Sequence, residues 1–280
     1  MNYIASKLFN EERDLFCASN LEVTNCKFVD GESPLKHSND IVVKACEFGY
    51  KYPLWYAKNI FVDKTTFHPL SRSGIWYTEN IKLKNCLVEA PKEFRRSKNI
   101  EIESCEFKDS QETLWGCNGV KIKDSTFKGD YLLMNSKNIE VDNMKLDGNY
   151  LCDGSENVVI RNSILKTKDA FWNSKNILIE NCKIVGEYFG WNSENITLKN
   201  CEIESLQGFC YIKNLVMVDC VLKNTTLAFE YSTVNVRILS RIGSIKNPSG
   251  GKIECYGYDE LILDEHCEDK TATIIEVIHE

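Results

Sequence analysis

The sequence predicts an all-β fold: a single-stranded right-handed parallel β-helix of about twelve coils of 19–21 residues, with terminal caps. Three observations predict this fold. A short motif recurs at nearly constant spacing, each copy is followed by alternating apolar and polar residues, and no segment has the periodicity of a helix. A stack of coils built from short strands accounts for all three.

The recurring motif is the tripeptide Asn-Ile-x or a close variant of it. Its first residue, the anchor, stands at Asn20, Asp40, Asn59, Asn80, Asn99, Gly119, Asn138, Asn157, Asn176, Asn195, Asn214 and Thr233. Successive anchors are 19 to 21 residues apart, and the last six intervals are all 19. Repetition at a fixed period over most of a chain is the signature of a solenoid.

The first strand of each coil begins at the anchor. The residues one and three positions after it are apolar in every coil, as in Ile177 and Ile179, and the residue between them is mostly polar. Period-two alternation of this kind is typical of a strand with one buried face. The fifth position is often Asn or Asp, which tolerate the left-handed conformation of a tight bend.

Two further strands complete the predicted coil. Six and eight positions after the anchor stand two more inward columns, the first rich in Cys and the second in Phe and aliphatic residues. Upstream, the residue five before the anchor is never charged, which predicts a third inward column. The absence of a six-residue period disfavours a left-handed β-helix and favours the right-handed form.

The predicted organisation is one domain, because no linker-like stretch interrupts the repeat. We assign residues 15–239 to the β-helix, residues 1–14 to an N-terminal cap and residues 240–280 to a C-terminal cap, since the repeat fades at both ends. Caps are expected because the open ends of a solenoid expose unpaired strand edges.

Composition and charge exclude several classes of protein. The net charge of −7 and the scattered lysines argue against nucleic-acid binding, and no apolar run approaches the ~20 residues that cross a membrane. The first residues lack the apolar core of a signal peptide, which predicts a cytoplasmic location with the 13 cysteines reduced. Without a CxxC pair or clustered histidines, we expect no metal and no cofactor.

Several runs carry a resemblance to a known family: Leu54-Trp55-Tyr56, Gly74-Ile75-Trp76-Tyr77, Lys168-Asp169-Ala170-Phe171-Trp172, Phe189-Gly190-Trp191 and Thr226-Leu227-Ala228-Phe229-Glu230-Tyr231. With these runs the chain resembles a bacterial family of uncharacterised proteins. That family is classed as a domain of unknown function within the pectate-lyase-like β-helix superfamily. The resemblance implies the fold and a bacterial origin, and it implies no activity and no catalytic residues.

The column four residues before each anchor is the most informative one. It contains all five tryptophans, together with Lys36, Arg95 and Asp153, and its alternation with the apolar column predicts that it points outward. The next column adds Tyr56, Tyr77 and Arg96. The candidate ligand-binding residues are therefore Trp55, Trp76, Arg95, Arg96, Trp115, Asp153, Trp172 and Trp191.

Three interpretations of this column remain open. Indole rings and guanidinium groups are suited to an extended saccharide, with Arg95 and Arg96 as contacts for a carboxylate. The tryptophans are equally suited to stacking on one another as a structural device. Trp and Arg are also enriched in protein interfaces, which would make the column a self-association surface.

The best-supported function is a carbohydrate-binding or carbohydrate-processing β-helix protein, and the alternative is a non-catalytic scaffold or oligomerisation module that uses the same column. Whether the protein is an enzyme is undecided. Acidic residues flank the column at Glu32, Glu93, Glu112, Asp130, Asp169 and Glu187. So many carboxylates satisfy the spacing rules of glycoside hydrolysis in several ways and single out no catalytic pair.

Overall fold

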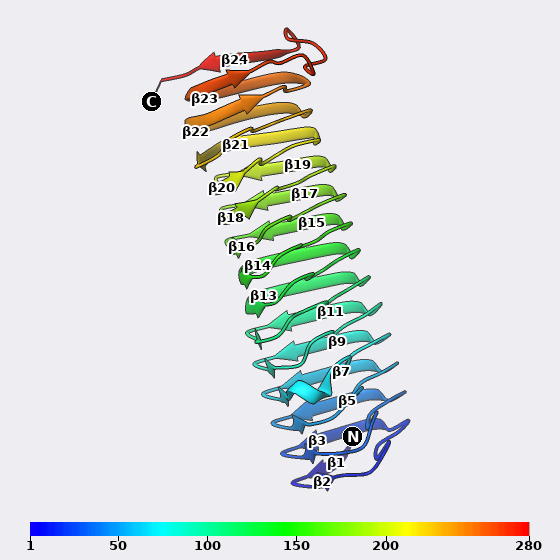
Figure 1. Ribbon diagram of the computed structural model, residues 1–280. Helices are drawn as coiled ribbons and strands as arrows, with labels where there is room; N and C mark the ends of the chain where they lie inside the picture. Colours follow the sequence, from blue (N-terminus) through cyan, green and yellow to red (C-terminus); the bar gives the residue numbers. More distant parts are fainter. Residues whose placement is uncertain (280) are drawn as a thin grey trace. The chain divides into compact units, whose positions relative to one another are not determined.

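The computed structural model describes residues 1–279 and shows an all-β parallel β-solenoid, which confirms the predicted fold class. The chain divides into two compact units, Met1–Lys145 (unit 1) and Leu146–Glu280 (unit 2). Each unit is a stack of turns, and each turn contributes short strands that pair with those of the next turn (Figure 1). No helix in the described part of the chain is long and apolar enough to span a membrane.

Unit 1 contains two series of strands, so the third strand predicted upstream of each anchor is not formed: that segment is a turn, with isolated bridges between Trp76 and Arg95 and between Arg95 and Trp115. The longer strands, apart from β1, contain the anchors, and the two-residue strands follow the next bend. They are β1 (Asn2–Ala5), β2 (Leu8–Phe9), β3 (Ser19–Thr24), β4 (Lys27–Phe28), β5 (Asn39–Lys44), β6 (Glu47–Phe48), β7 (Lys58–Asp63), β8 (Thr66–Phe67), β9 (Glu79–Lys84), β10 (Leu87–Val88), β11 (Lys98–Glu103), β12 (Glu106–Phe107) and β13 (Asn118–Lys128), with one 3-10 turn, η1 (Pro69–Ser71). Strand β14 (Lys137–Asp147) spans the boundary between the units.

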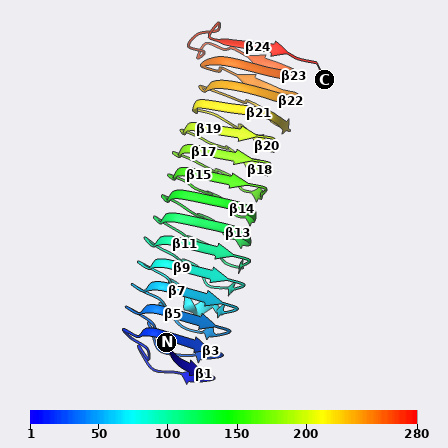
Figure 2. The same ribbon diagram turned by 180° about the vertical axis from the view of Figure 1, so that it is seen from behind.

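Unit 2 continues the same pattern in its own stack, which Figure 2 shows from behind. Its strands are β15 (Glu156–Arg161), β16 (Ile164–Lys166), β17 (Lys175–Glu180), β18 (Lys183–Glu187), β19 (Glu194–Lys199), β20 (Glu202–Leu206), β21 (Lys213–Lys223), β22 (Thr233–Lys246), β23 (Gly250–Ile262) and β24 (Thr273–Val277). Pairing is parallel and in register: Ile177 of β17 lies opposite Ile196 of β19, and Ile179 opposite Leu198.

The number of turns corrects the sequence analysis. The solenoid has about fifteen turns in the described residues instead of twelve. The additional ones are built on β1, β23 and β24, which lie in the segments assigned to caps. These strands pair in register with their neighbours, Ile4 opposite Val23 and Ile275 opposite Ile253. They were missed because no Asn-Ile anchor precedes them.

The core consists of columns of like residues. In unit 1 the rings of Phe9, Phe28, Phe48 and Phe67 stack with centroids 4.7, 4.8 and 5.1 Å apart. The cysteine column is buried and its thiols are free. Burial raises the pKa of the Cys46 thiol to about 11, so it remains a neutral, small apolar group.

The anchor asparagines are hydrogen-bonded to one another from turn to turn. Asn59, Asn80 and Asn99 have φ values of 53, 55 and 51°, in the left-handed region that asparagine tolerates. Asn80 Nδ2 donates to Asn59 Oδ1 at 2.9 Å, and Asn99 Nδ2 donates to Asn80 Oδ1 at 2.8 Å. Each rung thus bonds the same position of two successive turns.

Ion pairs link the outward residues of successive turns. Glu103 of β11 contacts Lys82 and Lys84 of β9, both at 2.8 Å, and these hydrogen bonds lower the pKa of its carboxyl to about 2. Many outward lysines are therefore paired with carboxylates of neighbouring turns.

The stacked core predicts a large difference between inward and outward phenylalanines. Phe48 is fully buried in the middle of the ring stack, whereas Phe61 of β7 is an outward, partly exposed residue. We expect Phe48→Ala to lower the free energy of unfolding by about 3–5 kcal/mol, and the matched control Phe61→Ala to lower it by less than about 1 kcal/mol. Urea denaturation measures both. Equal losses would contradict the assigned faces.

Candidate functional site

In unit 1 the column four residues before the anchor forms a continuous stack, here called the ladder: Lys36, Trp55, Trp76, Arg95 and Trp115. The Trp55 and Trp76 rings are parallel within 8° with centroids 5.4 Å apart. The Arg95 guanidinium carbon lies 4.6 Å from the Trp76 ring and 4.7 Å from the Trp115 ring. Lys36 Nζ lies 5.6 Å from the Trp55 ring. Cations thus cover ring faces and attract them electrostatically.

Hydrogen bonds fix the indoles in this stack. Trp55 Nε1 donates to the carbonyl of Ser73, and Trp76 Nε1 donates to the carbonyl of Lys92 at 2.7 Å. The rings are partly exposed, so their outer edges face solvent while their faces contact their neighbours. The tryptophans of the ladder therefore stack on one another, and their outer edges remain accessible to a ligand. This arrangement is compatible with both the structural and the saccharide-binding interpretation.

One hydrogen bond holds the Arg95 guanidinium at its outer end. Its Nη2 donates to Glu112 Oε2 at 3.0 Å, and Glu112 also contacts Lys92 Nζ at 3.2 Å. Its Nε is buried and has no hydrogen-bond partner within residues 1–279. Arg95 therefore contributes mainly through stacking and through this single carboxylate contact.

A second column, here called the rim, runs beside the ladder and comprises the stacked rings of His37, Tyr56 and Tyr77, with Arg96 at the same position of the next turn. The His37 and Tyr56 rings stack at 5.1 Å, and Tyr56 and Tyr77 at 4.8 Å. Each rim residue has a left-handed φ, between 51 and 59°, because the chain turns there. Tyr56 is 41 % exposed, which makes the rim more accessible than the ladder.

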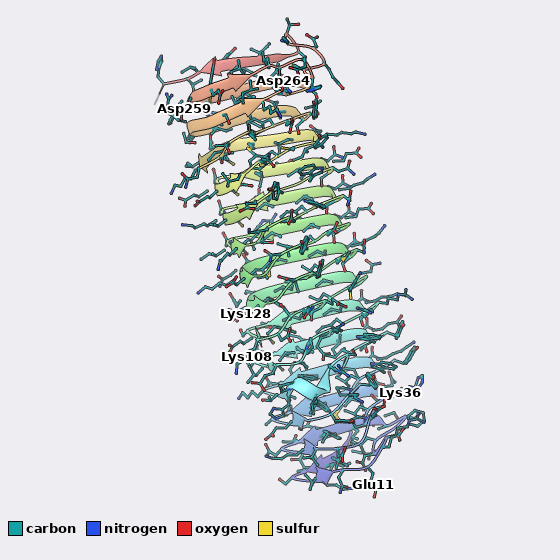
Figure 3. The ribbon with its side chains drawn as sticks, in the orientation of Figure 1. Glu11, Lys36, Lys108, Lys128, Asp259 and Asp264 are labelled. Atoms are coloured by element: carbon teal, nitrogen blue, oxygen red, sulfur yellow. The ribbon has the colours of Figure 1, made fainter. Side chains whose placement is uncertain are left out.

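Two cations of this surface differ from most of the lysines and arginines of the protein. Lys36 and Arg96 have no carboxylate within 4 Å in the part of the chain that the structure describes. Figure 3 shows Lys36 on one side of unit 1, with Lys108 on the opposite side. Lys108 is paired with Glu89 at 3.0 Å. The ladder and rim therefore form a local positive, aromatic surface on an acidic protein.

The remaining candidate residues lie in unit 2 and form a separate group. The Trp172 and Trp191 rings are 5.8 Å apart but tilted by 46°, and Trp191 stacks with Tyr211 at 5.1 Å. Trp172 Nε1 donates to the carbonyl of Tyr188 at 3.3 Å. Burial raises the pKa of Asp153, although a hydrogen bond from Asn173 opposes the rise. No unpaired cation is described beside these rings, and their role in binding stays a prediction.

Four of the six flanking carboxylates are paired with a lysine or arginine or buried, and these four do not point to a catalytic pair. Glu32 contacts Lys51 at 3.1 Å, Glu187 contacts Lys168 at 3.3 Å, and Glu112 is engaged as described above. Glu93 is fully buried. Within residues 1–279 no group of three or more His, Cys, Asp or Glu side chains is arranged to hold a metal ion.

Sequence reasoning missed two features of this site. His37 extends the rim, and its position three before the anchor, the same as that of Tyr56, was the available signal. The burial of Glu93 was also missed. It stands six before the anchor, where the three preceding coils have Pro34, Pro53 and Gly74, and that contrast could have marked it as unusual.

These observations define the class of protein: a parallel β-solenoid with an aromatic and cationic ladder on one unit. Residues 2–276 match the family described as "Protein of unknown function (DUF3737)", and the chain belongs to that family. A comparison with curated proteins gives no significant match.

Two solved structures align with most of this chain at low sequence identity. The surface protein and adhesin PfbA of Streptococcus pneumoniae is 10 % identical with a TM-score of 0.43, and the alignment covers 96 % of this chain and 91 % of that one. A tailspike protein of E. coli bacteriophage HK620, in complex with a hexasaccharide, is 14 % identical with a TM-score of 0.42, over 86 % of this chain and 60 % of that one.

The cation between two indoles predicts an energetic role for Arg95. We expect Arg95→Met, which keeps the aliphatic stem, to lower the free energy of unfolding by about 1–2 kcal/mol because two cation–π contacts are lost. The control is Arg161→Met in unit 2, whose arginine pairs with Glu180 at 2.8 Å and touches no ring. It should cost at most about 1 kcal/mol. Chemical denaturation followed by circular dichroism distinguishes the two.

Proposed function

We propose that the protein binds an extended acidic saccharide, a chain containing uronate residues, along the ladder and rim of unit 1. One observation carries this proposal: Lys36 and Arg96 are cations without carboxylate partners in the described residues, and they flank a surface of stacked aromatic rings. Carboxylates and sugar rings are the ligand groups that guanidinium and aromatic side chains recognise together.

The stacking defines how such a ligand would be contacted. Because the indole faces are covered by their neighbours, a sugar ring would lie against the outer edges of the indole rings and against the more exposed Tyr56. The Arg96 guanidinium has several free donors and can bind a carboxylate through two of them. Apolar contact and charge recognition would therefore come from different residues of the same turns.

The repeat also favours a polymeric ligand. Equivalent residues of successive turns are separated by one strand spacing, about 4.8 Å. The centroid distances of 4.8–5.4 Å along the ladder and the rim follow that spacing. A ligand with regularly repeated rings and carboxylates could make the same contact several times, and such multivalence raises the total affinity.

We propose binding alone and assign no bond-breaking step. Glu112, the carboxylate nearest to Arg95, has its two oxygens on Lys92 and Arg95. Glu93 has no exposed surface. Neither is placed to act on a ligand at the outer edge of the ladder.

Titration with a galacturonic acid oligomer tests the proposal. We expect the oligomer to quench tryptophan fluorescence at low salt, and the neutral galactose oligomer to have no effect, because the charged contacts are screened by salt and absent from the neutral sugar. Arg96→Ala should weaken binding about tenfold or more. The control Arg161→Ala should bind like wild type. Binding that survives the double change Arg95→Ala and Arg96→Ala would remove both residues from the site.

Sedimentation velocity distinguishes the alternative, a scaffold that self-associates through the same surface. On the saccharide proposal, the sedimentation coefficient should be independent of protein concentration and unchanged by Arg96→Ala. A concentration-dependent oligomer that this substitution dissociates, together with no response to the galacturonic acid oligomer, would favour the self-association surface instead.

A further inference from the structure

Glu93 is the one fully buried carboxyl among the described residues of unit 1, and the function proposed above does not use it. Its Oε2 accepts the backbone N–H of Gly74 at 2.9 Å. Its Oε1 is buried and has no hydrogen-bond partner within residues 1–279. A carboxylate anion in that position would lack most of its solvation.

The space around this carboxyl exists because residue 74 is glycine. A β-carbon at Gly74 would lie 2.6 and 3.0 Å from the two Glu93 oxygens and 2.8 Å from the Ser71 carbonyl oxygen. Burial of this carboxyl favours the neutral carboxylic acid.

Glu93 is also placed to control the ladder. Its neighbour in the chain, Lys92, provides the carbonyl that accepts the Trp76 indole N–H. The residue before Gly74 is Ser73, whose carbonyl accepts the Trp55 indole N–H. The contact between Glu93 and Gly74 therefore connects the two backbone segments that hold the stacked tryptophans.

We propose that Glu93 is a proton-linked positioning residue, which keeps Trp55 and Trp76 stacked while it is neutral and loosens them when it ionises. The consequence for saccharide binding rests on the function proposed above. The effect on the ladder itself does not, because it concerns the free protein.

The charged groups nearby do not offset this ionisation. Arg72, Lys92, Arg95 and Glu112, on the turns that flank Glu93, are exposed or partly exposed, and none contributes to its pKa shift. Burial raises the pKa of the Glu93 carboxyl well above its ordinary value, and backbone hydrogen bonds from Gly74 and Ile75 oppose the rise only in part. The inward Cys117 thiol, whose pKa burial raises to about 12, stays neutral.

The direction of the pH dependence follows from linkage. In the unfolded chain the Glu93 carboxyl loses its proton near pH 4.5, whereas in the folded chain it keeps the proton to a higher pH. Above pH 4.5 the folded state binds more protons than the unfolded state, so the stability contributed by this group falls as the pH rises toward the folded pKa.

Near-ultraviolet circular dichroism of the free protein between pH 5 and 9 tests the proposal, with Trp76→Phe identifying the signal of the stacked indoles. We expect that signal to weaken with rising pH in wild type and to stay constant in Glu93→Gln. The midpoint of thermal unfolding should fall with rising pH in wild type relative to Glu93→Gln, so that the difference between the two proteins grows by at least about 3 °C from pH 5 to pH 9. Glu112→Gln, which changes a nearby outward carboxyl, should keep the wild-type pH profile.

Identical pH profiles for wild type and Glu93→Gln would overturn the proposal, as would loss of the stacked-indole signal from Glu93→Gln at every pH. If that variant does not fold, infrared spectroscopy of wild type decides, because a protonated carboxyl at pH 7 absorbs separately from carboxylates and its absence would refute the neutral form. The affinity for the galacturonic acid oligomer should decrease as the pH rises in wild type and stay constant in Glu93→Gln. No binding at any pH would contradict the proposed function and leave the Glu93 result intact.

Discussion

The parallel, in-register hydrogen bonding between successive turns is the constraint on which the rest of the structure depends. Because Ile177 lies opposite Ile196 and not one residue away, each position of the repeat contacts the same position in the next turn. A shift of one residue would exchange the inward and outward faces of a strand. Side chains of a column are therefore forced to touch, whatever their chemistry.

This constraint selects residues that stabilise contact with their own kind. Phenylalanine rings stack at 4.7–5.1 Å, and asparagine amides donate to the amide of the preceding turn. Charged residues cannot stack on themselves without repulsion, so outward columns alternate in sign, as between Lys84 and Glu103. The ladder solves the same problem differently, because Arg95 separates Trp76 from Trp115 and attracts both rings.

Much of the fold could be predicted from the sequence because residues of the same type recur at the same position of successive coils. The anchor residues gave the spacing, and the alternation around Ile177 and Ile179 gave the inward face. The turns on β1, β23 and β24 could not be counted, since pairing geometry holds them without the anchor motif. For the site, the outward direction of Trp55, Trp76 and Arg95 was predictable. The coverage of their faces was not, since rotamers within a column depend on neighbours 19–21 residues away.

The functional interest of such a molecule lies where a column departs from its own pattern. A regular column of paired ions or stacked rings is saturated by its neighbours and has little left to offer a ligand. Arg96 follows the tyrosines of the rim without gaining a carboxylate among the described residues, and Glu93 is a buried carboxyl where the three preceding turns have Pro34, Pro53 and Gly74. The first leaves a charge available to solvent, and the second leaves a buried acid whose neutral form the surrounding turns favour. Both departures fall in the same few turns, next to the stacked indoles, which is the arrangement expected if the scaffold supplies rigidity and a small number of irregular residues supply recognition.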